Sequence, residues 1–419
     1  MNFFNRYKKI IYIALFVLAV ILIATFIWRA FFKTKITTIP TPTGTTTTPG
    51  ELPTAGEGGQ QVSSTTPGTI PGAGTIPGIS GAIPTTGPQV TATAQGGLTK
   101  VTPLNGGRAL NPLLSSDGKN IQYYNQTDGK FYKINEKGEM VALSDKVFYN
   151  VKTVDWAPNG SKAVLEYPDG SNIVYDFNSQ KQVTLPKHWE DFSFSKDSNQ
   201  LVSKSLGTDP DNRWLITSNS DGSNSKVIEY IGENDEKVIS SWSPNNQTIA
   251  LYTEGIDFNR QQLFFVGQNG ENFKSTIVEG RDVRAKWTPT GDRLLYSAYN
   301  SNSDLKPELW IVGAQGENIG AARTDLKINT WADKCTFATA TEIYCAVPES
   351  LERGAGMLPD LALKTKDNLY KIDVTTGAKK LIAIPNGSFN INSLVVTKDQ
   401  SQLYFTDQTS NQVYAVSLR

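Results

Sequence analysis

Few side chains in this sequence have the types and spacing that catalysis needs. The chain contains one histidine, His188, and two cysteines, Cys335 and Cys345. One imidazole and two thiols cannot form a multi-histidine or four-cysteine zinc site. A Ser-His-Asp hydrolase would have to use His188, but the sequence has no Gly-x-Ser-x-Gly nucleophile motif. We therefore interpret His188 as an exposed loop residue.

The two cysteines are placed symmetrically about an expected hairpin turn. Cys335 and Cys345 fall on consecutive predicted strands, with Ala340 at the midpoint between them. Residues equidistant from a hairpin turn face each other within disulfide range. We predict a structural disulfide, which requires an oxidising compartment. Two buried thiols are the alternative.

Acidic residues occur in many turns but form no recognisable catalytic set. Ser115–Asn120 and Ser218–Ser223 contain only fragments of the Asp boxes of sialidases, and turn formation explains their composition. A weak calcium site around Asp209, Asp211 and Asp221 is an alternative to the same turn chemistry. We predict no catalytic residue, no metal site and no cofactor.

Composition narrows the fold class and the possible partners. The formal net charge is zero, from 40 Lys+Arg and 40 Asp+Glu, whereas nucleic-acid-binding domains normally carry a basic surplus. The chain contains 18 Phe, 16 Tyr and 8 Trp. This aromatic content favours a turn-rich, all-β protein, and the balanced charge argues against nucleic-acid binding.

The N-terminal region predicts a membrane anchor. Ile10–Trp28 is apolar except for Thr25, and as a helix it would just span a hydrocarbon core of about 30 Å. It ends in bulky and basic residues, which make a poor signal-peptidase site, so we predict an uncleaved transmembrane signal anchor at residues 10–28. A cleaved signal peptide is the alternative.

Charge alone does not orient this anchor, because three basic residues lie on each side of it. The first nine residues are too few to form a domain, and the cysteine pair favours an oxidising location for the rest. We therefore expect residues 1–9 to be a cytoplasmic stub and the C-terminal domain to lie outside the cytoplasmic membrane.

Residues 29–97 predict a disordered linker. The main part, Ile36–Gly97, contains no aromatic residue, nine of the 21 prolines, and only Glu51 and Glu57 as charges. Such a segment buries too little apolar surface to offset the entropy of ordering it. We interpret it as a spacer between the membrane and residues 98–419.

A repeat runs through residues 98–419. Its units place a bulky residue before a small polar residue, a turn and a short apolar strand. Seven units average about 46 residues, a period typical of four-stranded propeller blades. The units begin at Leu114, Trp156, Phe194, Trp242, Trp287, Phe337 and Val396.

The last unit lacks an outer strand, and a segment before the first unit can supply it. Leu98–Pro103 is similar to the predicted outer strand Lys181–Pro186, and the missing strand falls on its part Lys100–Pro103. We predict that it completes the seventh blade and closes the ring. The fold class is thus all-β, a seven-bladed β-propeller. Six blades remain the alternative if the short first unit is wrongly divided.

Three of the turns carry a family resemblance. Trp156-Ala-Pro-Asn-Gly, Trp242-Ser-Pro-Asn-Asn and Trp287-Thr-Pro-Thr-Gly, together with Leu215–Asn224, resemble the TolB-like, WD40-like repeats of bacterial envelope proteins. The resemblance covers residues 109–419 and implies the propeller fold. It implies function only weakly, because such propellers serve as binding scaffolds and as gates of enzymes. In the TolB family a helical α/β domain precedes the blades, whereas here an anchor and a linker do.

One face of the predicted propeller carries long loops. The segment Glu349–Asp367 joins the second and third strands of blade six and is far longer than a hairpin needs. The corresponding b–c loops of blades three to five, at 207–212, 254–260 and 300–307, are also extended. Apolar residues that lie among charged residues in such a long loop are typical of a contact surface. A loop that packs on its own propeller and binds nothing is the alternative.

We therefore expect a membrane-anchored, non-enzymatic binding or scaffolding module of the cell envelope, whose partner is another envelope or secretion-system protein. The alternative is a glycan- or peptide-processing enzyme with its site in the propeller funnel. A cluster of perturbed carboxylates with Arg or Tyr in the funnel would favour the enzyme. The candidate contact residues are Glu349, Glu352, Arg353, Met357, Leu358, Asp360, Asp209, Asp257 and Arg260.

Overall fold

The computed structural model describes residues 89–271 and 273–419, together with Leu22 and Thr25. The predicted membrane span and most of the predicted linker lie outside the described residues. Leu22 and Thr25 are helical and exposed, and the Thr25 hydroxyl donates a hydrogen bond to the Leu22 carbonyl (2.9 Å). Among the described residues, no helix combines the length and apolar character needed to cross a membrane.

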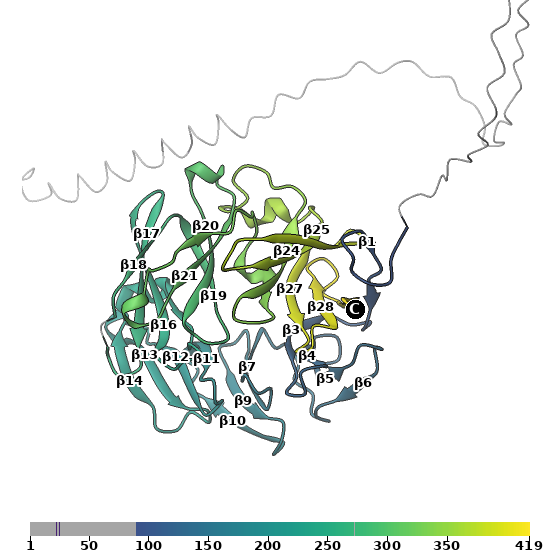
Figure 1. Cartoon of the computed structure of the whole chain (residues 1–419). Helices are drawn as coiled ribbons and strands as arrows, with labels where there is room; N and C mark the ends of the chain where they lie inside the picture. The colour runs from purple at the N-terminus through teal and green to yellow at the C-terminus, as the bar shows by residue number, and fades with distance from the viewer. Residues whose placement is uncertain (1–21, 23–24, 26–88, 272) are drawn as a thin grey trace, which may run out of the picture. The chain divides into compact units, whose positions relative to one another are not determined.

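Residues 98–419 form seven β-sheets arranged in a ring, the predicted seven-bladed propeller (Figure 1). Within each blade, consecutive strands pair antiparallel, with the first strand innermost. Blades one to three consist of β3 (Ala109–Leu114), β4 (Ile121–Asn125), β5 (Lys130–Ile134) and β6 (Met140–Ala142); β7 (Thr153–Trp156), β8 (Lys162–Glu166), β9 (Asn172–Asp176) and β10 (Lys181–Leu185); and β11 (Trp189–Phe194), β12 (Gln200–Leu206), β13 (Arg213–Asn219) and β14 (Lys226–Tyr230).

The remaining four blades follow the same order. They consist of β15 (Val238–Ser240), β16 (Thr248–Asp257), β17 (Arg260–Gly267) and β18 (Thr276–Val278); β19 (Arg281–Trp287), β20 (Arg293–Tyr299), β21 (Glu308–Gly313) and β22 (Thr324–Asp325); β23 (Cys335–Phe337), β24 (Glu342–Pro348), β25 (Asp367–Asp373) and β26 (Lys379–Pro385); and β27 (Ile391–Val396), β28 (Gln402–Asp407) and β29 (Val413–Ser417).

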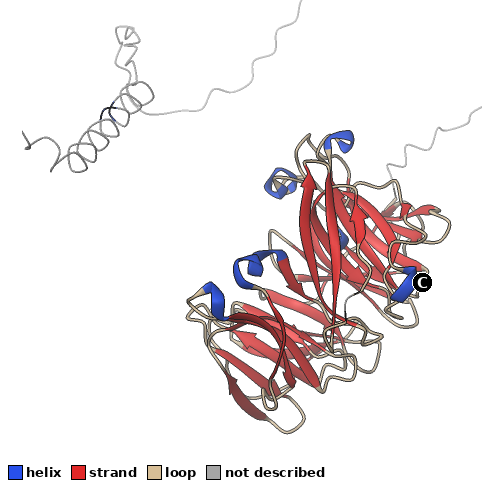
Figure 2. Cartoon of the chain, turned by 90° about the vertical axis from the view of Figure 1, so that its left-hand side faces the viewer, coloured by secondary structure: helices blue, strands red, loops and turns tan. Residues whose placement is uncertain are grey.

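Short 3₁₀ helices occur only in the connections between strands of the described chain (Figure 2). They are η1 (Pro210–Asn212), η2 (Gly232–Lys237), η3 (Ser301–Ser303), η4 (Gly316–Asn318), η5 (Ala332–Lys334) and η6 (Pro359–Ala362).

The hydrophobic core lies between neighbouring blades. Phe194 of blade three packs in one cluster with Val164 of blade two, and Trp242 of blade four packs with Val202 of blade three. Both aromatic side chains follow or end an innermost strand, and each is about 5–6% exposed. These large side chains thus fill the space between neighbouring blades.

The N-terminal strand closes the ring as predicted, and the preceding residues add contacts that were not predicted. β2 (Thr102–Pro103) pairs antiparallel with β29 as the outer strand of blade seven. β1 (Leu98–Thr99) pairs parallel with β26 and gives blade six a fifth strand. Thr91 and Thr93 form isolated bridges to Thr99 and Ser417. Residues before position 98, the predicted start of the propeller, therefore also contact the blades.

Blade four differs from its prediction in one respect. The segment 254–260, predicted as an extended loop, is the end of a β-hairpin in which β16 and β17 stay paired as far as Asp257 and Arg260. Its outer residues are exposed on both faces, so their sequence lacks the alternation of apolar and polar residues that marks a half-buried strand.

The predicted disulfide is present. Cys335 on β23 and Cys345 on β24 face each other in register, with a Cα–Cα distance of 4.1 Å, and their sulfur atoms are bonded. Both residues are completely buried among Leu295, Ile311 and Ile343. The bond joins the two inner strands of the blade that carries the long insert.

Candidate functional site

Three b–c connections are joined into one continuous surface, which we call the b–c rim: residues 254–260, 300–307 and 349–366 of blades four, five and six. The backbone and hydroxyl of Ser301 both donate to the Asn259 side chain at the hairpin tip (2.9 and 2.8 Å). On the other side, Gly354 and Gly356 donate backbone hydrogen bonds to Asp304 and Leu305 (2.9 and 2.7 Å). Each connection is thus held by its neighbour.

The insert of blade six approaches blade five very closely. A Cβ at Gly356 would lie 2.5 Å from Tyr299 Cβ and 2.7 Å from the Leu305 carbonyl oxygen. Any larger residue there would push the insert away from blade five. Glycine at position 356 therefore allows the insert to pack closely against blade five.

The insert also has its own small core and a polar anchor. Ala355 and Ala362 are buried against Trp331, and Leu351 packs beside them. The Asn390 amide of blade seven donates to the Ala362 carbonyl (2.6 Å). The insert is therefore a fixed part of the surface, in agreement with the alternative that it packs on its own propeller.

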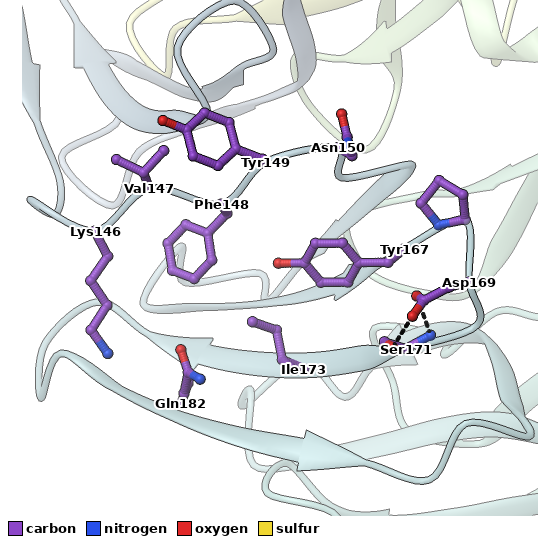
Figure 3. Close-up of a pocket in the computed structure, with 11 residues that line it drawn as sticks. Lys146, Val147, Phe148, Tyr149, Asn150, Tyr167, Asp169, Ser171, Ile173 and Gln182 are labelled. Carbon is purple, nitrogen blue, oxygen red and sulfur yellow. Dashed lines mark hydrogen bonds between the residues drawn. The ribbon is translucent and has the colours of Figure 1, made fainter.

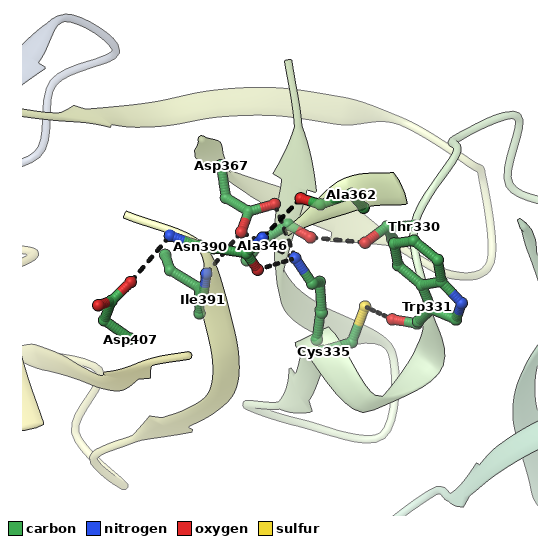
Figure 4. Close-up of polar contacts among 10 residues, drawn as sticks. Thr330, Trp331, Cys335, Ala346, Ala362, Asp367, Asn390, Ile391 and Asp407 are labelled. Atoms are coloured by element: carbon green, nitrogen blue, oxygen red, sulfur yellow. Dashed lines mark hydrogen bonds and ion pairs between the residues drawn. The ribbon is translucent and has the colours of Figure 1, made fainter. Parts of the chain in front are cut away.

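A buried ion pair lies beneath this anchor (Figure 4). The Lys334 ammonium on η5 donates to both Asp367 oxygens (3.1 and 2.9 Å) and to the Asn390 side-chain oxygen (3.1 Å). Asp367 also accepts the Ile391 N–H (2.6 Å), and Asp407 accepts the Asn390 N–H (2.9 Å). Burial nonetheless raises the pKa of Asp367, against the opposing effect of Lys334.

Apolar side chains remain exposed on the rim although the backbone beneath them is fixed. On the insert, Met357 and Leu358 are 47% and 56% exposed, and on the hairpin Ile256 and Phe258 are 45% and 53% exposed. Leu361 and Leu363 also lie on the outside of the insert. In Figure 1 the hairpin and the two neighbouring connections lie along the same side of the ring. Large apolar groups held out to solvent mark interaction surfaces.

Three of the predicted contact residues, Asp257, Arg260 and Glu349, form ion pairs within the chain. Asp257 and Arg260 form an ion pair (2.7 Å) across the hairpin tip, and hydrogen bonding to Arg260 lowers the pKa of Asp257. Glu349 pairs with Lys366 (3.1 Å) at the base of the insert. These pairs close the two loops on which they lie.

The other predicted residues fall into two groups. Glu352, Arg353 and Asp360 are exposed on the insert, beside Met357 and Leu358. Asp209 caps η1 by accepting the Asp211 N–H (3.1 Å) on the 207–212 loop. That loop is tied to η2 through the Arg213–Asp235 ion pair (3.0 Å), so its contacts are separate from those that join the b–c rim.

The sequence analysis missed a group of carboxylates in the centre of the ring. The inner strands line a cavity of about 660 Å³. Asp155 on β7 faces it, and Glu166 on β8 is diagonally adjacent, since Thr153 pairs with Glu166 and Asp155 pairs with Val164. Burial, reinforced by the charges of Glu166 and Asp191, raises the pKa of Asp155 well above its ordinary value. Burial also raises the pKa of Glu166.

Lys286 of blade five lines the same cavity. The Lys286 ammonium donates to the carbonyl oxygens of Asp333 and Cys335 (3.1 and 2.8 Å), and burial lowers its pKa. Arg284 pairs with Asp333 at 3.3 Å. The part of the chain that the structure describes contains no group of three or more His, Cys, Asp or Glu side chains arranged to hold a metal ion.

The signal for the carboxylates lay in strand alternation. Thr153 and Asp155 share one face of β7, whereas Val154 points to the opposite face.

His188 lies exposed on the connection between blades two and three, where its carbonyl accepts the Leu206 N–H (2.6 Å). This hydrogen bond holds the backbone of the loop, and the exposed position of His188 agrees with its interpretation as a loop residue.

Comparison with solved structures identifies the architecture. The chain is similar to the β-propeller domain of Cps50 (Swd1) from Myceliophteria thermophila, at 12% identity and a TM-score of 0.51, covering 76% of this chain and 100% of that one. It is also similar to an oligogalacturonate lyase in complex with manganese, at 15% identity and a TM-score of 0.50, covering 76% of this chain and 93% of that one. These likenesses support the propeller fold alone. No family model and no curated protein matches the sequence.

Proposed function

We propose that this protein is a membrane-anchored propeller that binds a protein partner of the cell envelope through the b–c rim. The observation that carries the proposal is the combination of a fixed backbone with exposed apolar side chains. Met357 and Leu358 stand on an insert held by blade five, blade seven and Trp331. A surface that is already ordered loses little conformational entropy when a partner covers it.

The proposed location follows from the N-terminal sequence and the cysteines. Residues 10–28 would anchor the chain in the cytoplasmic membrane, and the linker would hold the propeller outside it. The Cys335–Cys345 disulfide supports an oxidising compartment. The resemblance to TolB-like repeats supports an envelope role, and an envelope or secretion-system protein is the proposed partner.

Site-directed crosslinking in native cells tests this proposal. A photoreactive residue at Leu358 or Phe258 should capture the same protein, because both side chains belong to one surface. Val227, 61% exposed on the outer strand β14, is the matched control and should not capture that protein. Equal capture from all three positions would contradict a specific rim contact.

A double substitution, Met357→Asp with Leu358→Asp, should abolish the specific capture. Both side chains are exposed, so the free energy of unfolding should change by less than about 0.5 kcal/mol each. Replacing the whole insert would be less informative, because it would also uncover Trp331 and remove the Asn390–Ala362 hydrogen bond. Retention of the partner by the double variant would refute the proposal.

The central carboxylates favour a second candidate function, a glycan- or peptide-processing enzyme in the channel. Asp155 has a raised pKa and could supply a proton, while Lys286 lies in the same cavity. Hydrolysis of envelope glycans or peptides by the full chain, lost in Asp155→Asn, would support this candidate. Equal activity of the Asp155→Asn variant would exclude Asp155 from the chemistry.

A further inference from the structure

The same face of the ring has a second opening above blades one and two, on the other side of the channel from the b–c rim. It is a groove of about 720 Å³, within the range of small-molecule sites. One wall is the connection between β6 and β7, and the other is formed by the short b–c loop and the upper face of blade two (Figure 3). The lining includes Lys146, Phe148, Tyr149, Asn150, Tyr167, Asp169, Ser171, Ile173 and Gln182.

Phe148 fixes the first wall. It is buried, its ring packs edge-on against Tyr175 with centroids 4.9 Å apart, and its backbone N–H donates to the Gly129 carbonyl (2.7 Å). The Tyr124 hydroxyl donates to the Phe148 carbonyl. Because Phe148 points inward, its neighbour Tyr149 is held outward and is 70% exposed.

The opposite end of the groove carries an oriented carboxylate. Asp169 accepts the Ser171 N–H (3.0 Å) and hydroxyl (2.7 Å), and these bonds lower its pKa. Figure 3 shows Tyr167 pointing toward Phe148, with Asp169 and Ser171 at one end of the groove and Lys146 at the other. Aromatic groups thus occupy the middle, and groups that donate or accept hydrogen bonds occupy the ends.

We infer that this groove binds a neutral oligosaccharide. A sugar ring offers an apolar C–H face that suits Tyr167 in the middle of the groove and Tyr149, whose exposed ring lies at the edge of the groove (Figure 3). Its hydroxyl edges both donate and accept hydrogen bonds. The carboxylate of Asp169 and the amides of Asn150 and Gln182 match such hydroxyls. The lining itself holds one ammonium, Lys146, and one carboxylate, Asp169, which also pairs with Lys187 outside the lining (3.6 Å). With charges of both signs in close reach, neither a polyanion nor a polycation meets a surface of uniformly opposite charge.

An extended peptide fits the groove less well. A peptide gains much of its affinity by adding a strand to the free edge of a sheet. Here the lining consists of side chains above the face of blade two, with Ile173 and Gln182 on the neighbouring strands β9 and β10. The experiment below therefore compares the binding of peptides with the binding of glycans.

The test uses the full chain in lipid nanodiscs, free of glycosidic detergent, and measures binding by calorimetry and saturation-transfer NMR. The probes are cellotriose, tri-N-acetylchitotriose, trigalacturonate and an uncharged pentapeptide mixture. At least one neutral trisaccharide should bind more tightly than trigalacturonate. No neutral trisaccharide binding at millimolar concentration, tighter trigalacturonate binding, or peptide binding that displaces the trisaccharide would overturn the proposal.

Variants locate the binding. Tyr149→Ala should weaken the trisaccharide at least about tenfold, since it removes an exposed stacking surface without disturbing the core. Asp169→Asn should weaken it by a smaller factor, about threefold to tenfold, because it replaces a charge-assisted hydrogen bond by a neutral one. Tyr230→Ala, at a half-exposed tyrosine on β14, should leave affinity unchanged. Binding that Tyr149→Ala does not affect would place the sugar elsewhere.

Discussion

Breaking the buried Lys334–Asp367 pair should destabilise the propeller and release the insert. The Asp367 side chain is fully buried and that of Lys334 is 8% exposed. Asp367→Asn keeps the size of the side chain but leaves the ammonium with neutral partners. Removing one partner of a buried ion pair costs about 3–5 kcal/mol.

This cost can be converted into a shift of the thermal midpoint. The entropy of unfolding of a domain of roughly 330 residues is about 0.7 kcal/mol/K. Asp367→Asn should therefore lower the midpoint by about 4–7 °C, measured by calorimetry on the full chain. Trypsin should also cleave the insert faster at Arg353 and Lys364, because Asn390, which accepts a hydrogen bond from Lys334 and donates one to Ala362, loses its fixed position.

A double-mutant cycle separates the ion pair from simple loss of packing. Lys334→Met leaves an unpaired carboxylate and should cost as much as Asp367→Asn. The double variant removes both charges of the pair, and its amide oxygen can still accept the Ile391 N–H. It should lie within about 1 kcal/mol of the wild type. This account would be refuted if the two single losses of unfolding free energy added up in the double variant. It would also be refuted if Asp367→Asn unfolded within about 1 kcal/mol of the wild type.

Three further changes have defined outcomes. Asp155 has a raised pKa in the folded chain, so it favours the folded state below the ordinary aspartate pKa of about 3.9 and loses this contribution as pH rises through the raised value. Asp155→Asn should thus unfold at a higher temperature than the wild type at pH 8 but not at pH 4, and the opposite order would contradict the burial argument. Replacing Cys335 and Cys345 by serine opens a short loop and should cost about 3 kcal/mol in chemical denaturation, so an unchanged midpoint would show that the bond adds nothing. Gly356→Ala should speed proteolysis of the insert with little change in the global midpoint, whereas an unchanged cleavage rate would show that the insert tolerates the displacement.

The blades were predictable because each one repeats a local pattern. A bulky residue, a turn and a short strand recur at nearly constant spacing, and the pairing of Cys335 with Cys345 follows from their symmetry about one turn. The outer strand Thr102–Pro103 was found because blade seven visibly lacked one. The cysteine pairing is local, with its signal within 10 residues, whereas the outer strand was found from the repeat count although it pairs with a distant segment.

Other contacts between distant segments left no such signal. Leu98–Thr99 adds to blade six in parallel, far from Ile384 and Pro385 in sequence. The contact face on blades three to six stays a prediction. The contacts that join three of its loops could not be predicted, because they depend on side chains such as Asn259, which the sequence assigns only to a turn. Asp155 looked ordinary because inner strands tolerate polar residues facing a central cavity.

The closure of the ring also sets an order of events during synthesis. Val413 donates a hydrogen bond to Asn105, although the two are 308 residues apart, and β2 pairs with β29 in the same seam. A growing chain exposes β2 first and completes its partner only after residues 413–417 have been made. A chain that stops before Val413 has an open seam with unpaired strand edges, which proteases and other chains can engage. We expect a chain that ends before Val413 to be cleaved faster by proteases than a chain that includes β29.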